Sequence, residues 1–356
     1  HAGLEPVFAG RESEDMGIPE SECRPTPSDP DDRRITLDHG RHQRFRFRTA
    51  DINILGAADV GLPVRLAEYR LNGGSPSPLY VEPDQGEVPV PAHDTTSVLR
   101  LGRPGQFSIE IPVNANGLKK GANALDIRID DAGGERHQAA VEIWWEPSRV
   151  MLPLELGDLS RFASIQDVGQ VVDGAFEIDR PSNSIRTKSP VAADALLLLG
   201  SVARSQEATY DVVFGEWQPD TVFAGASDFF VSHDSQDPGL SIKPGYSTAG
   251  LVTIRPSGIA ETWLMRGALL RDHDWTWRQV DRYPVSVEPG IVYSVRHRLI
   301  LEDGFNWVRF KIWEKDTPEP ARWSCDSDTA TVSRRYKRFS GASFGLFQYG
   351  GQPTAW

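Results

Sequence analysis

Residues 107–145 read FSIEIPVNANGLKKGANALDIRIDDAGGERHQAAVEIWW, and apolar and polar side chains alternate through much of this stretch. Apolar residues occupy every second position of 107–111 and of 125–129. A period of two is typical of β-strands that bury one face. The letters DDAGG at 130–134 interrupt the pattern with residues that favour tight turns. The stretch therefore predicts antiparallel strands joined by a turn.

The same kind of pattern extends on both sides of this stretch, from residue 35 to residue 147. Short apolar or alternating runs stand at 45–48, 52–55 and 65–71, and the last of them ends at the turn signal NGG. Roughly seven short strands separated by turns are the signature of a two-sheet sandwich. We therefore expect an all-β sandwich over 35–147.

Four sequence segments in this region resemble the immunoglobulin-like modules of bacterial secreted proteins. They are ADINILGAADV at 50–60, AEYRLNGG at 67–74, the stretch 107–134, and VEIWW at 141–145. In that family YRLNGG is a strand and turn that present a small loop, and the LKKGANALDI pattern belongs to the final hairpin. The resemblance implies an immunoglobulin-like fold without implying an activity.

A proline-containing hinge, WEPS at 145–148, leads to a second half with longer strand-like runs. These runs lie at 195–202, 208–214, 249–255, 292–301, 307–315 and 342–349. No sustained helical period with caps interrupts them. The pattern predicts an antiparallel sandwich or jelly roll over 148–356.

The end of the chain sharpens this prediction. The segments that carry it are VDGAFEIDRPSNSIRTKS at 172–189, GIVYSVRHRLILEDGFNWVRFKIWEKDTPEPARW at 290–323, and SGASFGLFQYGGQPTAW at 340–356. They resemble concanavalin A-like jelly rolls of the laminin-G type, which carry a strand ending in Lys-x-Trp, a Thr-Pro-Glu-Pro turn and a Gly-x-x-Phe-Gly-Leu strand. The resemblance implies a jelly roll over 148–356, with a further strand expected after Trp356.

Composition and charge limit the classes of molecule that the protein is expected to bind. The formal net charge of −12 argues against nucleic acid or an anionic membrane surface as partner. The longest apolar run, 192–202, contains Asp194 and is shorter than the roughly 18 residues of a membrane span, so no membrane insertion is expected. Together with the resemblances, these features predict a secreted or cell-surface protein.

Residues 1–34 are polar, acidic and rich in proline, which predicts a disordered or tethered tail. The two cysteines are Cys23 in this tail and Cys325 near the other end. A disulfide between them, which would fit an oxidising compartment, and two unpaired thiols are equal alternatives.

The chain begins with His1, which indicates either a cleaved signal peptide or the remnant of a tag. A mature N-terminal histidine can chelate copper with a second histidine, as in lytic polysaccharide monooxygenases, and the second histidine would be His39, His42 or His93. The tail-like residues after His1 favour the tag remnant, because such a copper site needs a compact context.

The sequence RDHDWTWR at 271–278 is the part of the chain whose side chains most suggest ligand binding or catalysis. Aromatic faces stack on sugar C–H surfaces, and neighbouring polar groups hydrogen-bond the hydroxyls. The candidate glycan contacts are Trp263, Arg266, Asp272, His273, Asp274, Trp275 and Trp277. The competing interpretation is a hairpin tip whose aromatics cover the edge of the sandwich.

Asp272, His273, Asp274 and Glu261 could also supply acid/base chemistry for glycoside hydrolysis or β-elimination. The strand signatures of jelly-roll glucanases and alginate lyases are missing, however, and no catalytic residue is assigned. Carbohydrate binding by the jelly roll is therefore the leading hypothesis. A polysaccharide hydrolase or lyase comes second, and a self-associating structural subunit of an extracellular layer or filament comes third.

Two further clusters have both a functional and an ordinary interpretation. The acidic loop at 130–134, and Asp167 with Asp173, offer the oxygen ligands that Ca²⁺ prefers, but they lack EF-hand spacing and equally fit turn chemistry. The basic run RRYKR at 334–338 could bind a uronate or an acidic neighbour through arginine–carboxylate pairs. Such a run is more often a solvated loop before a strand.

Overall fold

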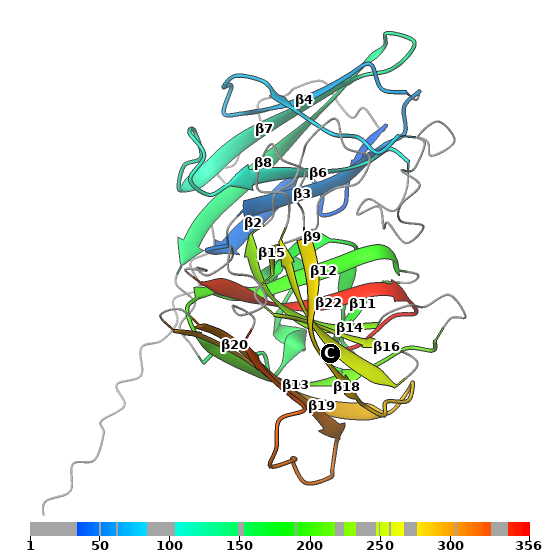
Figure 1. Ribbon diagram of the computed structural model, residues 1–356. Helices are drawn as coiled ribbons and strands as arrows, with labels where there is room; N and C mark the ends of the chain where they lie inside the picture. Colours follow the sequence, from blue (N-terminus) through cyan, green and yellow to red (C-terminus); the bar gives the residue numbers. More distant parts are fainter. Residues whose placement is uncertain are drawn as a thin grey trace, which may run out of the picture. The chain divides into compact units, whose positions relative to one another are not determined.

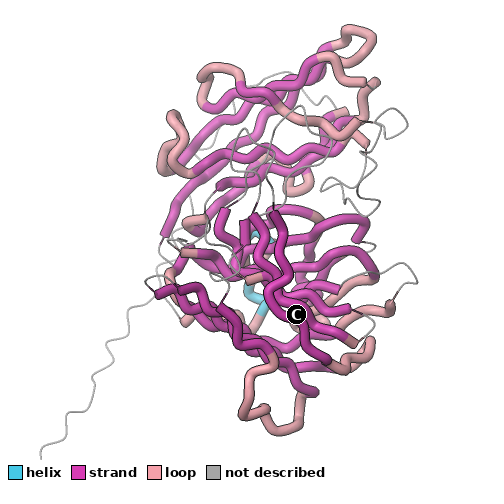
Figure 2. The backbone as a smooth tube through the Cα atoms, in the orientation of Figure 1, coloured by secondary structure: helices cyan, strands magenta, loops and turns pink. Residues whose placement is uncertain are grey.

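The computed structural model describes residues 34–49, 51–61, 63–83, 104–148, 153–188, 191–217, 224–232, 247–248, 250–255, 258–266, 276–302, 305–328 and 341–356. Residues 33–356 form one compact unit. Strands dominate the described residues, as the magenta segments of Figure 2 show, and the all-β prediction is confirmed. The helical segments described are two short 3₁₀ turns, η1 (Leu159–Arg161) and η2 (Ile165–Asp167). No helix in the described ranges has the length and apolar character needed to cross a membrane.

The strands up to residue 148 form two sheets (Figure 1). One has the order β1 (Ile35–Leu37), β3 (Asp51–Ala58), β6 (Gln106–Pro112). The other has the order β2 (His42–Phe47), β8 (Arg136–Ser148), β7 (Gly121–Asp130), β4 (Leu66–Leu71), β5 (Ser77–Pro78), and β2 runs parallel to β8. The alternating residues predicted from the sequence supply a shared core, in which Phe107, Leu125 and Val141 are almost fully buried.

The NGG signal at 72–74 forms the predicted turn after β4. Asn72 and Gly73 both have positive φ, at 51° and 69°, a conformation that asparagine and glycine tolerate best. The Asn72 side chain also donates to the Gly117 carbonyl at 2.7 Å and accepts from the Ala124 amide at 2.9 Å. The turn is therefore tied to the neighbouring hairpin.

The strands after residue 169 form a second pair of sheets. The larger has the order β18 (Thr276–Pro284), β17 (Ile259–Arg266), β16 (Leu251–Arg255), β14 (Ala224–Ser232), β22 (Ala342–Gly351), β12 (Val191–Ala203), β9 (Gln170–Asp173), with β15 (Ser247–Thr248) beside β14. The smaller has the order β13 (Gln206–Val213), β19 (Val292–Glu302), β20 (Phe305–Glu314), β21 (Cys325–Asp328). A separate hairpin pairs β10 (Phe176–Asp179) with β11 (Ser184–Thr187).

The pleat of β19 determines which of its side chains face the core. Every second residue from Tyr293 to Leu301 is buried, and the residues between them are partly exposed. These inward side chains pack with Phe310 of the neighbouring strand β20 and with Phe229 and other apolar residues of the facing sheet. The six longest strands predicted in this half are all present, with ends shifted by a few residues. The TPEP sequence lies, as the resemblance implied, in the loop between β20 and β21.

A buried polar cluster joins β9 to β3. The Gln170 amide donates to the Asp51 carbonyl at 2.8 Å and to Asn53 Oδ1 at 2.6 Å, and its carbonyl accepts from the Thr49 hydroxyl at 3.2 Å. All four residues are almost fully buried. Burying a polar group without a hydrogen-bond partner costs free energy, so these bonds favour one relative position of β9 and β3.

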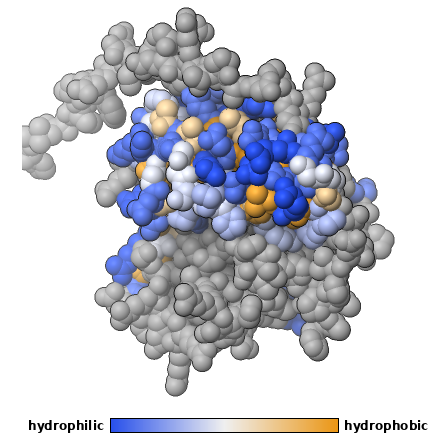
Figure 3. All heavy atoms as spheres, turned by 90° about the horizontal axis from the view of Figure 1, so that it is seen from above, coloured by the Kyte–Doolittle hydropathy of each residue, from blue (hydrophilic) through white to orange (hydrophobic). Residues whose placement is uncertain are grey.

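Surface hydropathy agrees with a core that collects the apolar side chains. Seen from above, the described surface is mostly hydrophilic, and its hydrophobic residues form small groups among hydrophilic ones (Figure 3). Among the described residues, the exposed large hydrophobic ones are Leu66, Leu154, Val202 and the adjacent pair Ile291 and Val292. Single exposed apolar residues of this kind are normal for a protein surface.

Cys325 begins β21 and is fully buried, with its Sγ 3.7 Å from the Val308 carbonyl. Cys23 lies outside the described residues, as does the rest of the predicted tail except Arg34. The disulfide between Cys23 and Cys325 therefore stays a prediction.

Candidate functional site

The aromatic region predicted from the sequence lies at one end of the larger sheet. Trp263 and Arg266 are in β17, and Trp277 is in β18, the last strand of that sheet. Trp263 pairs with Gln279, and Trp277 pairs with Met265. Positions 263 and 277 therefore belong to the same face of the sheet. Asp272, His273, Asp274 and Trp275 belong to the connection between the two strands, which lies outside the described residues. The region stays a prediction.

Glu261, which the sequence offered as an acid/base partner, is engaged in an ion-pair cluster. Its carboxylate is buried and lies 2.9 Å from Arg255 Nε and 3.6 Å from Arg282 Nε. Because Arg255, Glu261 and Arg282 come from three adjacent strands, β16, β17 and β18, these ion pairs connect the strands. Its environment therefore supports a role in the sheet.

Ser227 and His297 have the distance of a nucleophile and its base, with Oγ 2.7 Å from Nδ1. Both residues are completely buried, and His297 lies edge-on to Phe229 and Phe310, with ring centroids 4.4 and 5.6 Å away. Burial lowers the pKa of His297 to about 3, so its ring is neutral at pH 7. A pair enclosed between the sheets has no access to a substrate, and we assign it to the core.

The outer face of the smaller sheet carries most of the charged side chains of that sheet. Arg296 and Arg298 alternate with the buried residues of β19 and therefore point away from the core. Arg298 lies 2.5 Å from Glu207, and Arg296 lies 3.0 Å from Glu319. These pairs connect strands β13 and β19 with the loop after β20.

The loop between β20 and β21 folds back over the outer face of the smaller sheet. It places Trp323 against the side chains of Lys311 and Arg298. Lys311 Nζ lies 4.8 Å from the centre of the Trp323 ring, and the Arg298 guanidinium lies 5.2 Å from it. Lys311 also contacts Trp313 at 6.0 Å. Cations stacked on an indole fix its orientation, and Trp313 and Trp323 both remain partly exposed. We call this set of residues the Trp323 surface: Glu207, Arg296, Arg298, Lys311, Trp313, Glu319 and Trp323.

Lys311 is the centre of the Trp323 surface. Its side chain is 8% exposed, its ammonium donates to the Pro320 carbonyl at 2.8 Å, and it pairs with Glu319 at 2.5 Å. The Lys311 ammonium holds the pKa of Glu319 below its usual range. The charges are thus paired within the surface, which leaves a rigid, partly exposed aromatic platform with polar groups around it.

Sequence reasoning missed this surface as a site. It treated the sequence KIWEKDTPEPARW at 311–323 as a sign of the fold alone, although Lys311, Trp313 and Trp323 all come from it. A lysine two residues before a tryptophan in a strand was the available signal, because such residues share one face. The fold of the loop, which brings Trp323 back onto Lys311, was not readable from the pattern.

The histidines named as copper partners have other environments. His42 lies 3.2 Å from Glu142 on the neighbouring strand β8, and His39 lines a pocket. His1 and His93 lie outside the described residues. The copper hypothesis therefore gains no support.

The acidic loop at 130–134 contains two carboxylates, those of Asp130 and Asp131, which have different partners. Asp130 contacts three guanidinium groups, from Arg65, Arg128 and Arg136, and the bond from Arg128 is the main reason that its pKa falls to about 2. Asp131 accepts from the Glu135 amide at 2.9 Å and lies 3.4 Å from His137 Nε2. Ligand atoms of Asp131, Glu135 and His137 lie within 4.8 Å of one another, but this hydrogen bonding explains the loop without an ion.

The other acidic pair has structural partners too. Asp167, the last residue of η2, accepts from the amide of the N-cap residue Ser164 at 3.0 Å in a capping box, and Arg46 lies 3.5 Å from its other oxygen. Asp173 is buried in β9. Capping explains the position of Asp167. The basic run at 334–338 lies outside the described residues.

No protein-family model and no curated protein matches the chain. Among solved structures, a chain described as a sialidase is similar over 64% of this chain and 18% of its own length, with 12% identity and a TM-score of 0.35. SGBP-B of the Bacteroides ovatus mixed-linkage glucan utilization locus, in complex with a mixed-linkage heptasaccharide, is similar over 92% of this chain and 100% of its own, with 11% identity and a TM-score of 0.17. Likeness at this level says nothing of a shared activity.

Proposed function

We propose that the protein is a secreted or cell-surface carbohydrate-binding protein that contacts polysaccharide through the Trp323 surface. In this proposal residues 35–147 form an immunoglobulin-like module and residues 148–356 form a laminin-G-type jelly roll that carries the site. The observation that supports it best is the Trp323 ring, held on Lys311 and Arg298 and still partly exposed.

The chemistry of this surface suits a sugar. An indole face packs against the C–H groups of a pyranose ring, and carboxylates and guanidinium groups at its edge hydrogen-bond the hydroxyls. Because the contacts with Lys311 and Arg298 already orient Trp323, little conformational entropy is lost when a glycan binds. The partner is a polysaccharide or a cell-surface glycan, which places the protein outside the cell.

The region around Trp263, Arg266, Asp272, His273, Asp274, Trp275 and Trp277 remains a second proposed contact region. The two regions come from different sheets, so single substitutions separate them. Trp275→Ala tests the second region, and Trp323→Ala tests the first.

We expect Trp323→Ala to weaken binding to a retained polysaccharide about tenfold, which is about 1.4 kcal/mol, because one stacking face is lost. Affinity electrophoresis through gels that contain neutral or acidic polysaccharides identifies the ligand, and calorimetry with that ligand gives the affinity. Far-UV circular dichroism shows whether the variant keeps its fold.

The matched control is Trp144→Ala, which removes another partly exposed tryptophan, one in β8 whose Nε1–H donates to Glu146 at 3.3 Å. It should leave the affinity unchanged. Equal retention of wild type and Trp323→Ala would count against the Trp323 surface. New reducing or unsaturated ends in the polysaccharide would instead make the protein an enzyme.

A further inference from the structure

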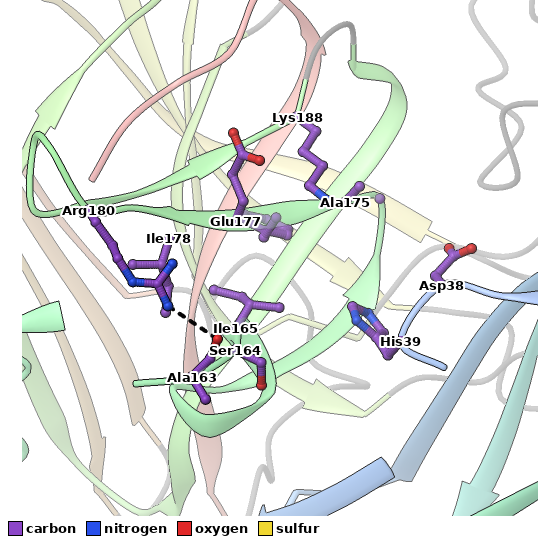
Figure 4. A pocket seen from close by; sticks show the side chains of 12 residues that line it. Asp38, His39, Ala163, Ser164, Ile165, Ala175, Glu177, Ile178, Arg180 and Lys188 are labelled. Atoms are coloured by element: carbon purple, nitrogen blue, oxygen red, sulfur yellow. Dashed lines mark hydrogen bonds between the residues drawn. The ribbon is translucent and has the colours of Figure 1, made fainter. Parts of the chain in front are cut away.

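A pocket of about 320 Å³ lies beside the β10–β11 hairpin, away from the residues of the Trp323 surface. His39, from the turn after β1, forms one side, and Arg180 and Lys188 stand on other sides. Figure 4 shows these three side chains arranged around Ile165. Ile165 and Ile178 give the pocket an apolar wall, so it combines cationic groups with a surface for C–H contacts.

The positive charges of this pocket are not balanced by its carboxylates. Lys188 has no ion pair or side-chain hydrogen bond within the described ranges, and Arg180 Nη2 donates to two backbone carbonyls, at 3.0 and 3.3 Å. Glu177 also lines the pocket, but Arg186 Nε neutralises it at 2.6 Å. Asp38 is exposed at the rim, and Figure 4 shows its carboxylate on the far side of His39 from Arg180.

His39 adds a polar atom that lacks a partner. Its Nε2 is buried and has no hydrogen bond with a residue in the described ranges. Burial, with a smaller effect of the Lys188 charge, lowers the pKa of His39 to about 4, so the ring is neutral at pH 7. A neutral imidazole with Nε2 protonated is a hydrogen-bond donor, and a buried donor without a partner is costly.

We propose that this pocket binds an acidic sugar residue, with the carboxylate of the sugar beside Lys188 and Arg180 and the sugar ring against Ile165 and Ile178. The neutral His39 ring forms part of the wall beside the sugar. The choice of a sugar rests on the proposed glycan binding, but the residues are different from those of the Trp323 surface. The protein would then hold a neutral segment of a glycan on one surface and an acidic residue in the pocket.

The test is calorimetry of the whole chain with galacturonate, and with galactose and acetate as separate ligands. We expect galacturonate to bind more tightly than either, because galactose lacks the carboxylate and acetate lacks the ring. Lys188→Met should weaken galacturonate binding about fivefold, and salt should weaken binding to the wild type, because the contact is exposed and screened. Lys188→Arg should restore most of the affinity.

Lys120→Met is the matched control, because Lys120 is an exposed lysine between β6 and β7, and it should change nothing. Equal binding of galacturonate and galactose, equal binding of acetate, or an unchanged affinity in Lys188→Met would each overturn the proposal. Trp323→Ala separates the two hypotheses. If it weakens polysaccharide retention but leaves galacturonate binding intact, both stand. If the wild type binds polysaccharide but not galacturonate, the pocket proposal alone is wrong.

Discussion

Acidification from pH 7 to pH 4 is expected to lower the free energy of unfolding by about 3 kcal/mol through His297 alone. Burial holds the pKa of this histidine at about 3 in the folded protein, against an ordinary value of 6.5 in the unfolded chain. Between these values the unfolded state binds a proton that the folded state does not. Stability therefore falls as the pH drops below 6.5, and the loss from His297 is complete below about pH 3.

The measurement is urea unfolding at pH 7 and pH 4, for the wild type and for His297→Gln. Glutamine keeps a hydrogen-bonding group near Ser227 Oγ but cannot take up a proton, so the variant should lose about 3 kcal/mol less than the wild type between the two pH values. His42→Gln is the control, because that side chain is 70% exposed. Equal losses in the wild type and His297→Gln would show that His297 is not neutral and buried in solution.

The position of His297 also shows how much the sequence can predict. The run 292–301 was expected to be a strand, and its period of two places residue 297 in the same series as Val295 and Leu299, which are buried. Alternation therefore locates a core histidine without coordinates. The contacts with Ser227 and Phe229 come from β14, a strand that was not predicted and that lies on the facing sheet. Sequence pattern gives the face of a strand but not what it packs against.

The same limit explains the candidate sites. Trp313 and Lys311 share a strand face by parity, whereas Trp323 joins them because a ten-residue loop folds back after β20. The pocket needs a turn at His39 to meet a hairpin more than a hundred residues later. Propensity and periodicity are local, and contacts between distant segments depend on the whole packing. The residues predicted as a site were clustered in sequence, while the sites supported by geometry are assembled from separate segments.

Trp356→Ala is expected to destabilise the protein by about 3 kcal/mol, which is the lower end of the cost of deleting a core aromatic side chain, because Trp356 is partly buried. The ring packs against the two apolar clusters of the second pair of sheets and lies 6.1 Å from Phe176. Its Nε1–H donates to the Ala226 carbonyl at 2.9 Å, and the Trp356 backbone exchanges two hydrogen bonds with Ile185. The backbone of Trp356 thus binds β11, while its side chain binds β14 and packs on both clusters.

Trp356→Phe separates packing from hydrogen bonding. Phenylalanine keeps most of the ring and loses the N–H, which leaves the buried Ala226 carbonyl without this donor and should cost about 1 kcal/mol. Urea unfolding followed by far-UV circular dichroism measures both variants without relying on tryptophan emission. A loss below about 1 kcal/mol for Trp356→Ala would mean that the segment after β22 does not stabilise the sandwich. A large loss in Trp356→Phe, equal to that of the alanine variant, would place the effect in the hydrogen bond and not in the ring.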